Sequence, residues 1–273
     1  MTKLCAVLNV TRSGYYAWDK RPKSRRAQRR ERIIDMVEGE FLASHRILGG
    51  RKIAEILRGK GEKVSVGLIA RIMREKGLIS KVVKKYKATT NSNHNLPVAE
   101  NLLNREFHAV RLNEKWVSGI TYVATDEGWL YVAGILDLYG HEIVGWSMGE
   151  RMTRELVINC LNQACGRRGN PKSVLLHSDR GSQYCSHEHQ QLIEQYGFTC
   201  SMIRKGDFFD NAPMESFWGK LKQEWLNDKY FKTRAEAKSA IFWHIEVFYR
   251  RKRPHEANGY LTPEAYTRAA ANF

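Results

Sequence analysis

The spacing of apolar residues changes along the chain and predicts two different kinds of structure. Up to about residue 77, apolar residues recur every three or four positions, the period of a helix buried on one face. This period predicts helices at 12–18, across 33–42, at 51–58 and from Ser65 to Gly77. From residue 113 onward, runs rich in β-branched and aromatic residues alternate with helical patterns. The N-terminal part is therefore expected to be all-α, and the remainder α/β.

The second part reads as a meander of strands followed by a mixture of helices and strands. Strands are expected at 115–124, 129–138, 142–150, 173–177 and 198–202, and helices at 153–166, 187–196 and 234–250. A further helix begins near Met214, where Asn211 can act as the cap and Pro213 fits the first turn. The expected order is three antiparallel strands, a helix, a strand and further helices.

Two short predicted helices surround a glycine turn at 60–63, which is the helix-turn-helix pattern. The first carries Arg51 and Lys52, and the second carries Arg71 and Arg74. On a second, recognition helix, Arg71 and Arg74 could reach a DNA groove. Small three-helix units also serve in protein–protein contacts, so the pattern alone leaves both interpretations open.

The distribution of charge favours the DNA-binding interpretation. The chain has a net charge of +16. Residues 1–90 hold 23 Lys and Arg against 8 Asp and Glu, whereas the remaining residues hold 22 against 21. Almost all the excess positive charge is therefore N-terminal, as expected for a phosphate-binding region joined to a near-neutral core. The basic stretch continues through Lys84 and Lys85.

Composition suggests a division into four parts. We expect an N-terminal helical segment at 1–20, a helix-turn-helix region at 21–88, a linker at 89–112 and a core with a helical tail at 113–273. The five cysteines form no CxxC pair, no apolar run reaches 18 residues and no signal peptide is visible. These features predict a cytoplasmic protein without a membrane segment.

Two acidic residues are candidates for metal binding. Asp179 follows the short apolar strand at 173–177, and Glu215 lies just inside the helix that begins near Met214. Carboxylates are preferred ligands of Mg²⁺ and Mn²⁺, and a pair of such ions can promote phosphodiester chemistry. Taken singly, each acid is better explained as a turn residue or a solvated helix residue. The ordered set of motifs around them is more specific.

The chain resembles the DDE transposases of bacterial insertion sequences, in particular the products of a second reading frame with a retroviral-integrase-like core. The resemblance covers nearly the whole chain. It is carried by Trp116-Val117 with Ile120-Thr121-Tyr122, Leu136-Asp137-Leu138 with Val144-Gly145-Trp146, His177 to Tyr184, Asp210-Asn211-Ala212 with Glu215, and Arg253-Pro254-His255.

This resemblance implies an RNase H-like catalytic core behind an all-α helix-turn-helix region. It implies metal-dependent cleavage and transfer of DNA strands, with two Mg²⁺ or Mn²⁺ ions held in part by Asp179 and Glu215. The DNA partners would be the terminal inverted repeats of the element and a target duplex. A dimer or larger homo-oligomer is expected, and relatives often act with an upstream helix-turn-helix protein. Lys222, seven residues after Glu215, matches a basic residue implicated in holding the terminal DNA phosphate.

One departure from the family pattern concerns the first catalytic aspartate, whose position is occupied by Gly119. Glycine provides no ligand, so the chemistry of this chain is expected to be strongly impaired. If the hairpin turn centres on 126–127, Asp137 lies opposite Trp116, three residues from Gly119, and points to the other face of the sheet. Asp137 is therefore a poor replacement. An engineered substitution and a naturally inactive copy both account for this glycine.

Two other functions compete with the transposase interpretation. A DNA-binding regulator without catalysis would occupy element ends and block active subunits, and Gly119 favours it. A structure-specific nuclease would need the same three acidic positions but would not join strands. Binding to inverted repeats separates the first two functions from the nuclease, and strand joining separates the transposase from the regulator.

Overall fold

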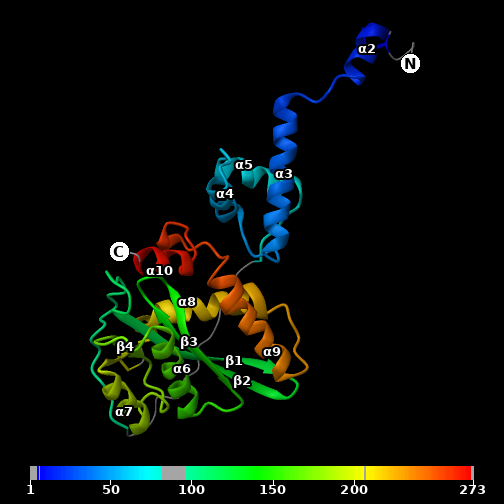
Figure 1. Cartoon of the computed structure of the whole chain (residues 1–273). Helices are drawn as coiled ribbons and strands as arrows, with labels where there is room; N and C mark the ends of the chain where they lie inside the picture. Colours follow the sequence, from blue (N-terminus) through cyan, green and yellow to red (C-terminus); the bar gives the residue numbers. More distant parts are fainter. Residues whose placement is uncertain (1–4, 6, 82–95, 206, 272–273) are drawn as a thin grey trace. The chain divides into compact units, whose positions relative to one another are not determined.

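The computed structural model describes residue 5 and residues 7–81, 96–205 and 207–271 (Figure 1). The chain divides into two compact units, Met1–Ser80 and Lys81–Phe273. The first unit is helical and the second holds the sheet. The expected boundaries at residues 20, 88 and 112 stay predictions. Within the described residues, no helix combines the length and the apolar character needed to cross a lipid bilayer.

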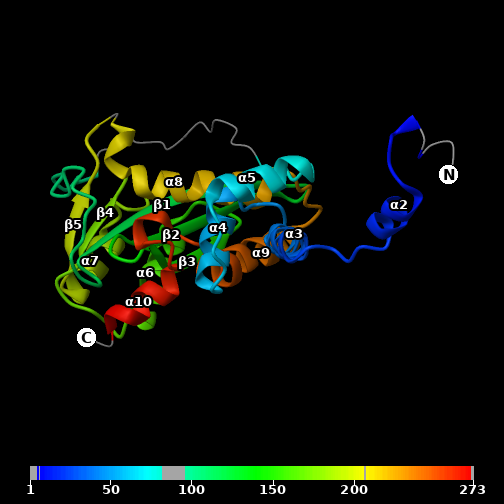
Figure 2. The same cartoon turned by 90° about the horizontal axis from the view of Figure 1, so that it is seen from above.

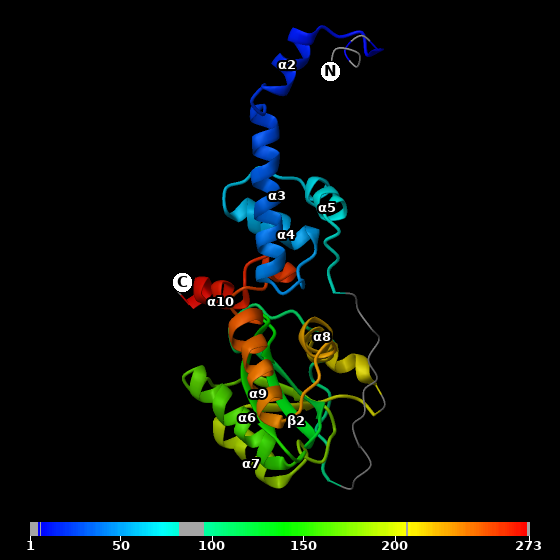
Figure 3. The ribbon, with the colours of Figure 1, turned by 90° about the vertical axis from the view of Figure 1, so that its right-hand side faces the viewer.

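The first unit is built on the long helix α3 (Arg25–Ala43), which follows the short helix α2 (Arg12–Asp19). Ile33, Val37 and Phe41 are the buried positions of α3, at helical spacing. They pack with apolar side chains of α4 (Gly50–Gly59) and α5 (Val66–Glu75), which lie beside α3 in Figure 3. The all-α prediction is confirmed for this unit.

Helices α4 and α5 form the expected pair of short helices. The Ser65 side chain caps α5 by accepting a hydrogen bond from the Leu68 amide at 3.1 Å. Gly77 follows the C-cap with φ of +64°, a backbone conformation that glycine adopts without strain. Arg51, Arg71 and Arg74 are exposed, so the helix pair presents cationic side chains to solvent.

The second unit contains one five-stranded sheet in the order β3-β2-β1-β4-β5. Its strands are β1 (Lys115–Thr125), β2 (Gly128–Asp137), β3 (Glu142–Gly149), β4 (Leu175–Ser178) and β5 (Thr199–Met202). The first three form an antiparallel meander, and β4 and β5 add in parallel beyond β1. This mixed α/β architecture is the one expected from the strand and helix pattern.

The two faces of the sheet are covered by different helices. On one face, α6 (Arg154–Arg167) packs on β2 and β3 and contacts α7 (His187–Tyr196). On the other face, α8 (Ala212–Leu221) follows the turn η1 (Phe208–Asn211) and packs on β1 and β2. Figure 2 shows α8 and α6 on opposite sides of the sheet. Strand residues of opposite parity therefore meet different helices.

The close approach of α8 depends on a pair of glycines. Gly119 on β1 is paired with Gly134 on β2. A Cβ atom on Gly134 would lie 2.8 Å from Met214 Cε and 2.9 Å from Trp218 Cη2. The absence of side chains at this pair lets Met214 and Trp218 pack directly on the backbone of the sheet.

The segment expected to be helical at 234–250 is helical, but its second half is wound as a π-helix. Helix α9 (Arg234–Phe242) continues as the π-helical segment η3 (Trp243–Tyr249). Helix α8 likewise continues as a π-helical turn, η2 (Lys222–Leu226). The short turn η4 (Glu256–Asn258) and helix α10 (Pro263–Ala271) complete the chain.

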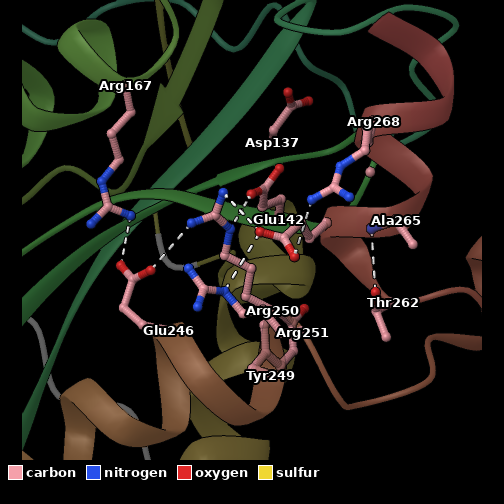
Figure 4. A network of polar contacts seen from close by, with 12 residues as sticks. Asp137, Glu142, Arg167, Glu246, Tyr249, Arg250, Arg251, Thr262, Ala265 and Arg268 are labelled. Carbon is pink, nitrogen blue, oxygen red and sulfur yellow. Dashed lines mark hydrogen bonds and ion pairs between the residues drawn. The ribbon is translucent and has the colours of Figure 1, made fainter. Parts of the chain in front are cut away.

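A network of ion pairs ties the C-terminal segment to the sheet (Figure 4). Glu142, at the start of the edge strand β3, accepts hydrogen bonds from Arg168 and Arg250, both at 2.8 Å. Arg250 also lies 3.5 Å from Glu264 of α10, and Arg167 lies 2.6 Å from Glu246 of η3. The network therefore joins α6, β3, η3 and α10.

Candidate functional site

The sheet brings Gly119 and Asp179 side by side. Strands β1 and β4 are parallel, and the last residues paired between them are Val117 and His177. Two residues further on, β1 reaches Gly119 and the other chain segment reaches Asp179, one residue beyond the end of β4. Neighbouring strands lie about 4.8 Å apart, and residues two apart on a strand share a face. A side chain at position 119 would therefore emerge next to the Asp179 carboxylate.

Glu215 lies on α8, the helix that faces this part of the sheet. It lies in the first turn of α8, one residue from Met214, which packs against Gly119. Burial raises the pKa of Glu215, and the negative charge of Asp179 raises it further. Burial also raises the pKa of Asp179, although the Gly181 amide donates to its Oδ1 at 2.8 Å. The two carboxylates are therefore close enough to repel each other.

The space beside Gly119 is occupied by side chains of α8. A Cβ atom added at Gly119 would lie 3.1 Å from Met214 Cγ, 3.3 Å from Trp218 Nε1 and 3.7 Å from Asn211 Nδ2. The Trp218 indole N–H is buried and has no hydrogen-bond partner. A buried donor without an acceptor is costly, and a carboxylate at position 119 would bring an acceptor to this donor.

Asn211 occupies the N-cap position of α8, but its side chain does not cap the helix as expected. Instead, Asn211 Nδ2 donates to the backbone carbonyl of Ser118 at 2.9 Å. This bond fixes the start of α8 to β1, next to Gly119. The sequence indicated the helix start, but the competing acceptor on a strand 93 residues away could not be inferred from local spacing.

Asp210, from the motif Asp210-Asn211-Ala212, fixes the segment that precedes α8. Its carboxylate is fully buried and accepts from Asn101 Nδ2 and Arg105 Nε, both at 2.8 Å. It also accepts from the Arg204 amide at 2.9 Å and from Arg204 Nε at 3.1 Å. These bonds hold the segment before α8 against residues 101–105, which were expected to belong to a linker.

His177 begins the motif that contains Asp179 and lies two residues before it. The structure buries its ring, with Nδ1 2.8 Å from Ser201 Oγ. Burial lowers the pKa of His177 to about 4, so the ring is neutral at pH 7. Ser201 Oγ in turn accepts from the amides of Leu102 and Leu103. These contacts make His177 a link between β4, β5 and the segment before β1.

Asp137 has the register that the sequence predicted, opposite Trp116. It therefore points to the face away from Gly119. Its buried carboxylate accepts from the amides of Tyr139 at 3.0 Å and Asn113 at 3.2 Å, and it lies 3.5 Å from Arg168. Asp137 thus serves the ion-pair network at the edge strand and is directed away from Asp179 and Glu215.

Lys222 begins the π-helical turn η2, two helical turns after Glu215. Its ammonium nitrogen lies 4.6 Å from the centre of the Tyr122 ring on β1. Burial lowers the pKa of Lys222 to about 8, so the side chain is still mostly protonated at pH 7. Lys222 therefore places a positive charge against the Tyr122 ring of β1, two helical turns beyond Glu215 on the same continuous helical segment.

The other predicted DNA-binding residues belong to the first unit or fall outside the described residues. Arg51 and Lys52 lie in the first turn of α4, and Arg71 and Arg74 lie on α5. Lys84 and Lys85 lie outside the described residues. Among the described residues, no group of three or more His, Cys, Asp or Glu side chains is placed to hold a metal ion. The carboxylate pair of Asp179 and Glu215 thus lacks a third acidic neighbour.

The fold and the motifs define a class of protein, an integrase core preceded by a helix-turn-helix unit. Two family models described as integrase core domain match residues 109–207 and 196–263. A third model, described as HTH-like domain, matches residues 28–86. The RNase H-like core and the helix-turn-helix region expected from the sequence are confirmed by these matches.

Similar proteins assign the chain to a particular family within this class. It is 46% identical over 263 residues to the insertion element IS600 uncharacterized 31 kDa protein of Shigella sonnei, covering 96% of this chain and 97% of the relative. It is 39% identical over 265 residues to transposase InsF for insertion sequence IS3A of Escherichia coli, covering 96% and 92%. The chain belongs to the family of IS3-type insertion-sequence transposases.

Solved structures with lower similarity include two viral proteins. One is the HTLV-2 integrase catalytic core domain in complex with magnesium, at 16% identity and a TM-score of 0.46, covering 59% of this chain and 99% of that chain. The other is a chain of the simian T-cell lymphotropic virus intasome in complex with PP2A regulatory subunit B56 gamma. It shows 15% identity and a TM-score of 0.45, covering 76% of this chain and 67% of that chain.

Proposed function

We propose that this chain is a transposase subunit that binds the ends of its element but carries strongly impaired strand-transfer chemistry. The observation that carries the proposal is the position of Gly119, which faces the helix that bears Glu215 and lies two residues past the last residue of β1 paired with β4, the strand that leads to Asp179. The helix-turn-helix unit would bind the terminal inverted repeats, and Lys222 would bind a DNA phosphate near the carboxylates. Strand transfer joins two element ends to a target duplex, so the working assembly would be a homodimer or larger.

The residues present fit a divalent cation in part. Asp179 and Glu215 supply the oxygen ligands that Mg²⁺ and Mn²⁺ prefer. Burial raises the pKa of both carboxyl groups, and the charge of Asp179 adds to the rise at Glu215, so a cation would favour their ionised forms. When bound, such an ion activates a hydroxyl group and stabilises the leaving oxygen of a phosphodiester. The carboxylate that would complete a two-metal set is missing at position 119.

The function is tested by an Mg²⁺-dependent cleavage and joining assay on element-end DNA, comparing this chain with Gly119→Asp. Activity in the Asp form alone would identify the chain as an inactivated transposase. Equal activity in both forms would show that another group supplies the missing ligand. If both bind element ends and neither cuts, the non-catalytic DNA-binding regulator becomes the better function.

Binding of a divalent cation to the carboxylate pair is expected to stabilise the second unit. At ten times its dissociation constant, an ion that binds only the folded state adds about 1.4 kcal/mol to the free energy of unfolding. The melting temperature should then rise by roughly 3–6 °C. Calorimetry with Mg²⁺ or Mn²⁺ would measure this rise, and Glu215→Gln should abolish it. A rise of the same size in Glu215→Gln would mean that the ion binds elsewhere.

Removal of a recognition-helix arginine should weaken binding to the element end. Arg71→Ala and Arg74→Ala are each expected to cost about 1–3 kcal/mol, roughly 5-fold to 150-fold in affinity, through the loss of a base or phosphate contact. Arg58→Ala is a suitable control, because Arg58 lies on the other helix and pairs with Glu55 at 2.7 Å. Fluorescence anisotropy on inverted-repeat duplex would measure the difference. Equal losses in all three variants would argue against α5 as the recognition helix.

A further inference from the structure

In the motif Arg253-Pro254-His255, Arg253 forms an ion pair with Glu224. The proposed function assigns no role to this pair. The Arg253 side chain is 6% exposed and holds the carboxylate of Glu224, which is 14% exposed. Arg253 Nε lies 3.0 and 2.9 Å from the two Glu224 oxygens, and Arg253 Nη2 lies 2.5 Å from Oε1. His244 Nε2 adds a contact to the same carboxylate at 3.5 Å. The Glu224 carboxylate is therefore fixed from two directions.

Glu224 belongs to the π-helical turn η2, which begins at Lys222. The turn is closed by a 2.7 Å hydrogen bond from the Asn227 amide to the Lys222 carbonyl, five residues apart. A π-turn is rare and frequently marks a functional site. Outside contacts support it here, because the Trp225 ring stacks on Trp243 with 4.2 Å between centroids. Two residues of the turn are thus held from outside it: Glu224 by Arg253 and Trp225 by Trp243.

The turn and the segment after it carry two cations beside one cavity. Lys222 lies over the Tyr122 ring, and the Lys229 ammonium nitrogen lies 3.2 Å from the centre of the Trp225 ring. Both lysines line a cavity of about 340 Å³, together with Tyr122, Val123, Ala124, Leu226, Asn227 and Phe231. Two ammonium groups and an amide side chain around an open cavity are suited to an anionic ligand with more than one phosphate.

We infer that Arg253 is a positioning residue for DNA: by clamping Glu224 it fixes the π-turn, so that Lys222 and Lys229 together bind phosphates of the DNA strand held next to the carboxylates. Seven residues of helix separate Lys222 from Glu215, about 10 Å along the helix axis. The cavity would therefore hold the backbone one or two nucleotides away from the reacting phosphate. This inference rests on the proposed binding of element ends.

A purely structural role for the Arg253–Glu224 pair makes a different prediction. Breaking a buried ion pair lowers stability whatever its neighbours do. A positioning role instead requires that the loss of Arg253 and the loss of Lys222 affect the same DNA contact. The number of phosphate contacts can be read from the salt dependence of DNA affinity, since each contact adds about 0.9 to the slope of log K against log salt.

The experiment measures binding of the full chain to a duplex with one element end over a series of KCl concentrations. We expect Lys222→Ala and Lys229→Ala each to lower the salt slope by about 1. Arg253→Lys should lower it by 1 to 2, because lysine cannot reproduce the two-pronged contact of arginine. Arg253→Lys combined with Lys222→Ala should lose no more than Arg253→Lys alone. Lys172→Ala, an exposed lysine on the loop before β4, is the control and should leave binding nearly unchanged.

Two outcomes would decide against the inference. An unchanged salt slope in Arg253→Lys, with a lowered melting temperature, would assign the pair a structural role only. Additive losses in the double variant would also overturn it, since independent contacts add. If Arg253→Lys does not fold, Glu224→Gln provides the same comparison with the arginine retained. Failure of the unaltered chain to prefer element-end over unrelated duplex would instead refute the proposed function.

Discussion

Gly119→Asp is expected to raise Mg²⁺-dependent cleavage and joining of element-end DNA by about a thousandfold or more. Metal ions supply several kcal/mol of transition-state stabilisation, and about 4 kcal/mol corresponds to three orders of magnitude in rate. The new carboxylate would emerge beside Asp179, because positions 119 and 179 follow the paired residues Val117 and His177 by two. Single-turnover assays with end-labelled DNA would measure the gain.

The space around position 119 permits this substitution at a small cost. The tightest contact of the added Cβ would be 3.1 Å to Met214 Cγ, and an unbranched methionine side chain adjusts readily. Gly119→Asn is the matched control, because it has the size of aspartate without the charge. Comparable activity in the Asn and Asp forms would show that packing, rather than a metal ligand, limits the reaction.

Glu142→Ala is expected to destabilise the second unit by about 3 kcal/mol, the cost of breaking a buried ion pair from one side. The Glu142 side chain is 7% exposed, and its removal leaves Arg168, 12% exposed, without its 2.8 Å partner. It also releases Arg250, which connects β3 to the C-terminal segment. The melting temperature should fall by roughly 6–12 °C, measured by calorimetry.

Arg268→Ala is the control within the same network. Arg268 is 72% exposed and lies 3.7 Å from Glu264, so its loss should change stability by less than about 1 kcal/mol. An equal loss of stability in the two variants would mean that burial does not determine the strength of these ion pairs. A Glu142→Ala protein as stable as the unaltered chain would show that the C-terminal segment is held by apolar packing alone.

Much of the fold was predictable because the signals that define it are local. Alternating residues gave β1, β2 and β3 to within about two residues, and the helical period gave α6 and α7. Ser65 and Gly77 marked the ends of α5 through backbone preferences that operate within a few residues. The register of Asp137 with Trp116 followed from the position of one turn.

The unpredicted features depend on partners far apart in the sequence. The π-helical turns have the same apolar pattern as a regular helix, and the contact between Glu224 and Arg253 spans 29 residues. Asn211 donates a hydrogen bond to the Ser118 carbonyl instead of capping its own helix. Asp210 accepts hydrogen bonds from Asn101, Arg105 and Arg204. Helix-capping rules and hydrophobic periodicity describe contacts between residues a few positions apart, so they cannot predict these long-range contacts. The sequence therefore predicted the candidate carboxylates but not the contacts that position them.

The glycine pair on β1 and β2 has an evolutionary consequence. Because Met214 and Trp218 fill the space over Gly119 and Gly134, loss of a carboxylate at position 119 leaves a well-packed protein rather than an internal void. Selection against misfolding would then not remove this allele. Two of the four glycine codons differ from an aspartate codon by one nucleotide, so such a gene could regain its acidic residue by a single transition. A silent copy with either of these two codons would thus need one nucleotide change to regain the aspartate.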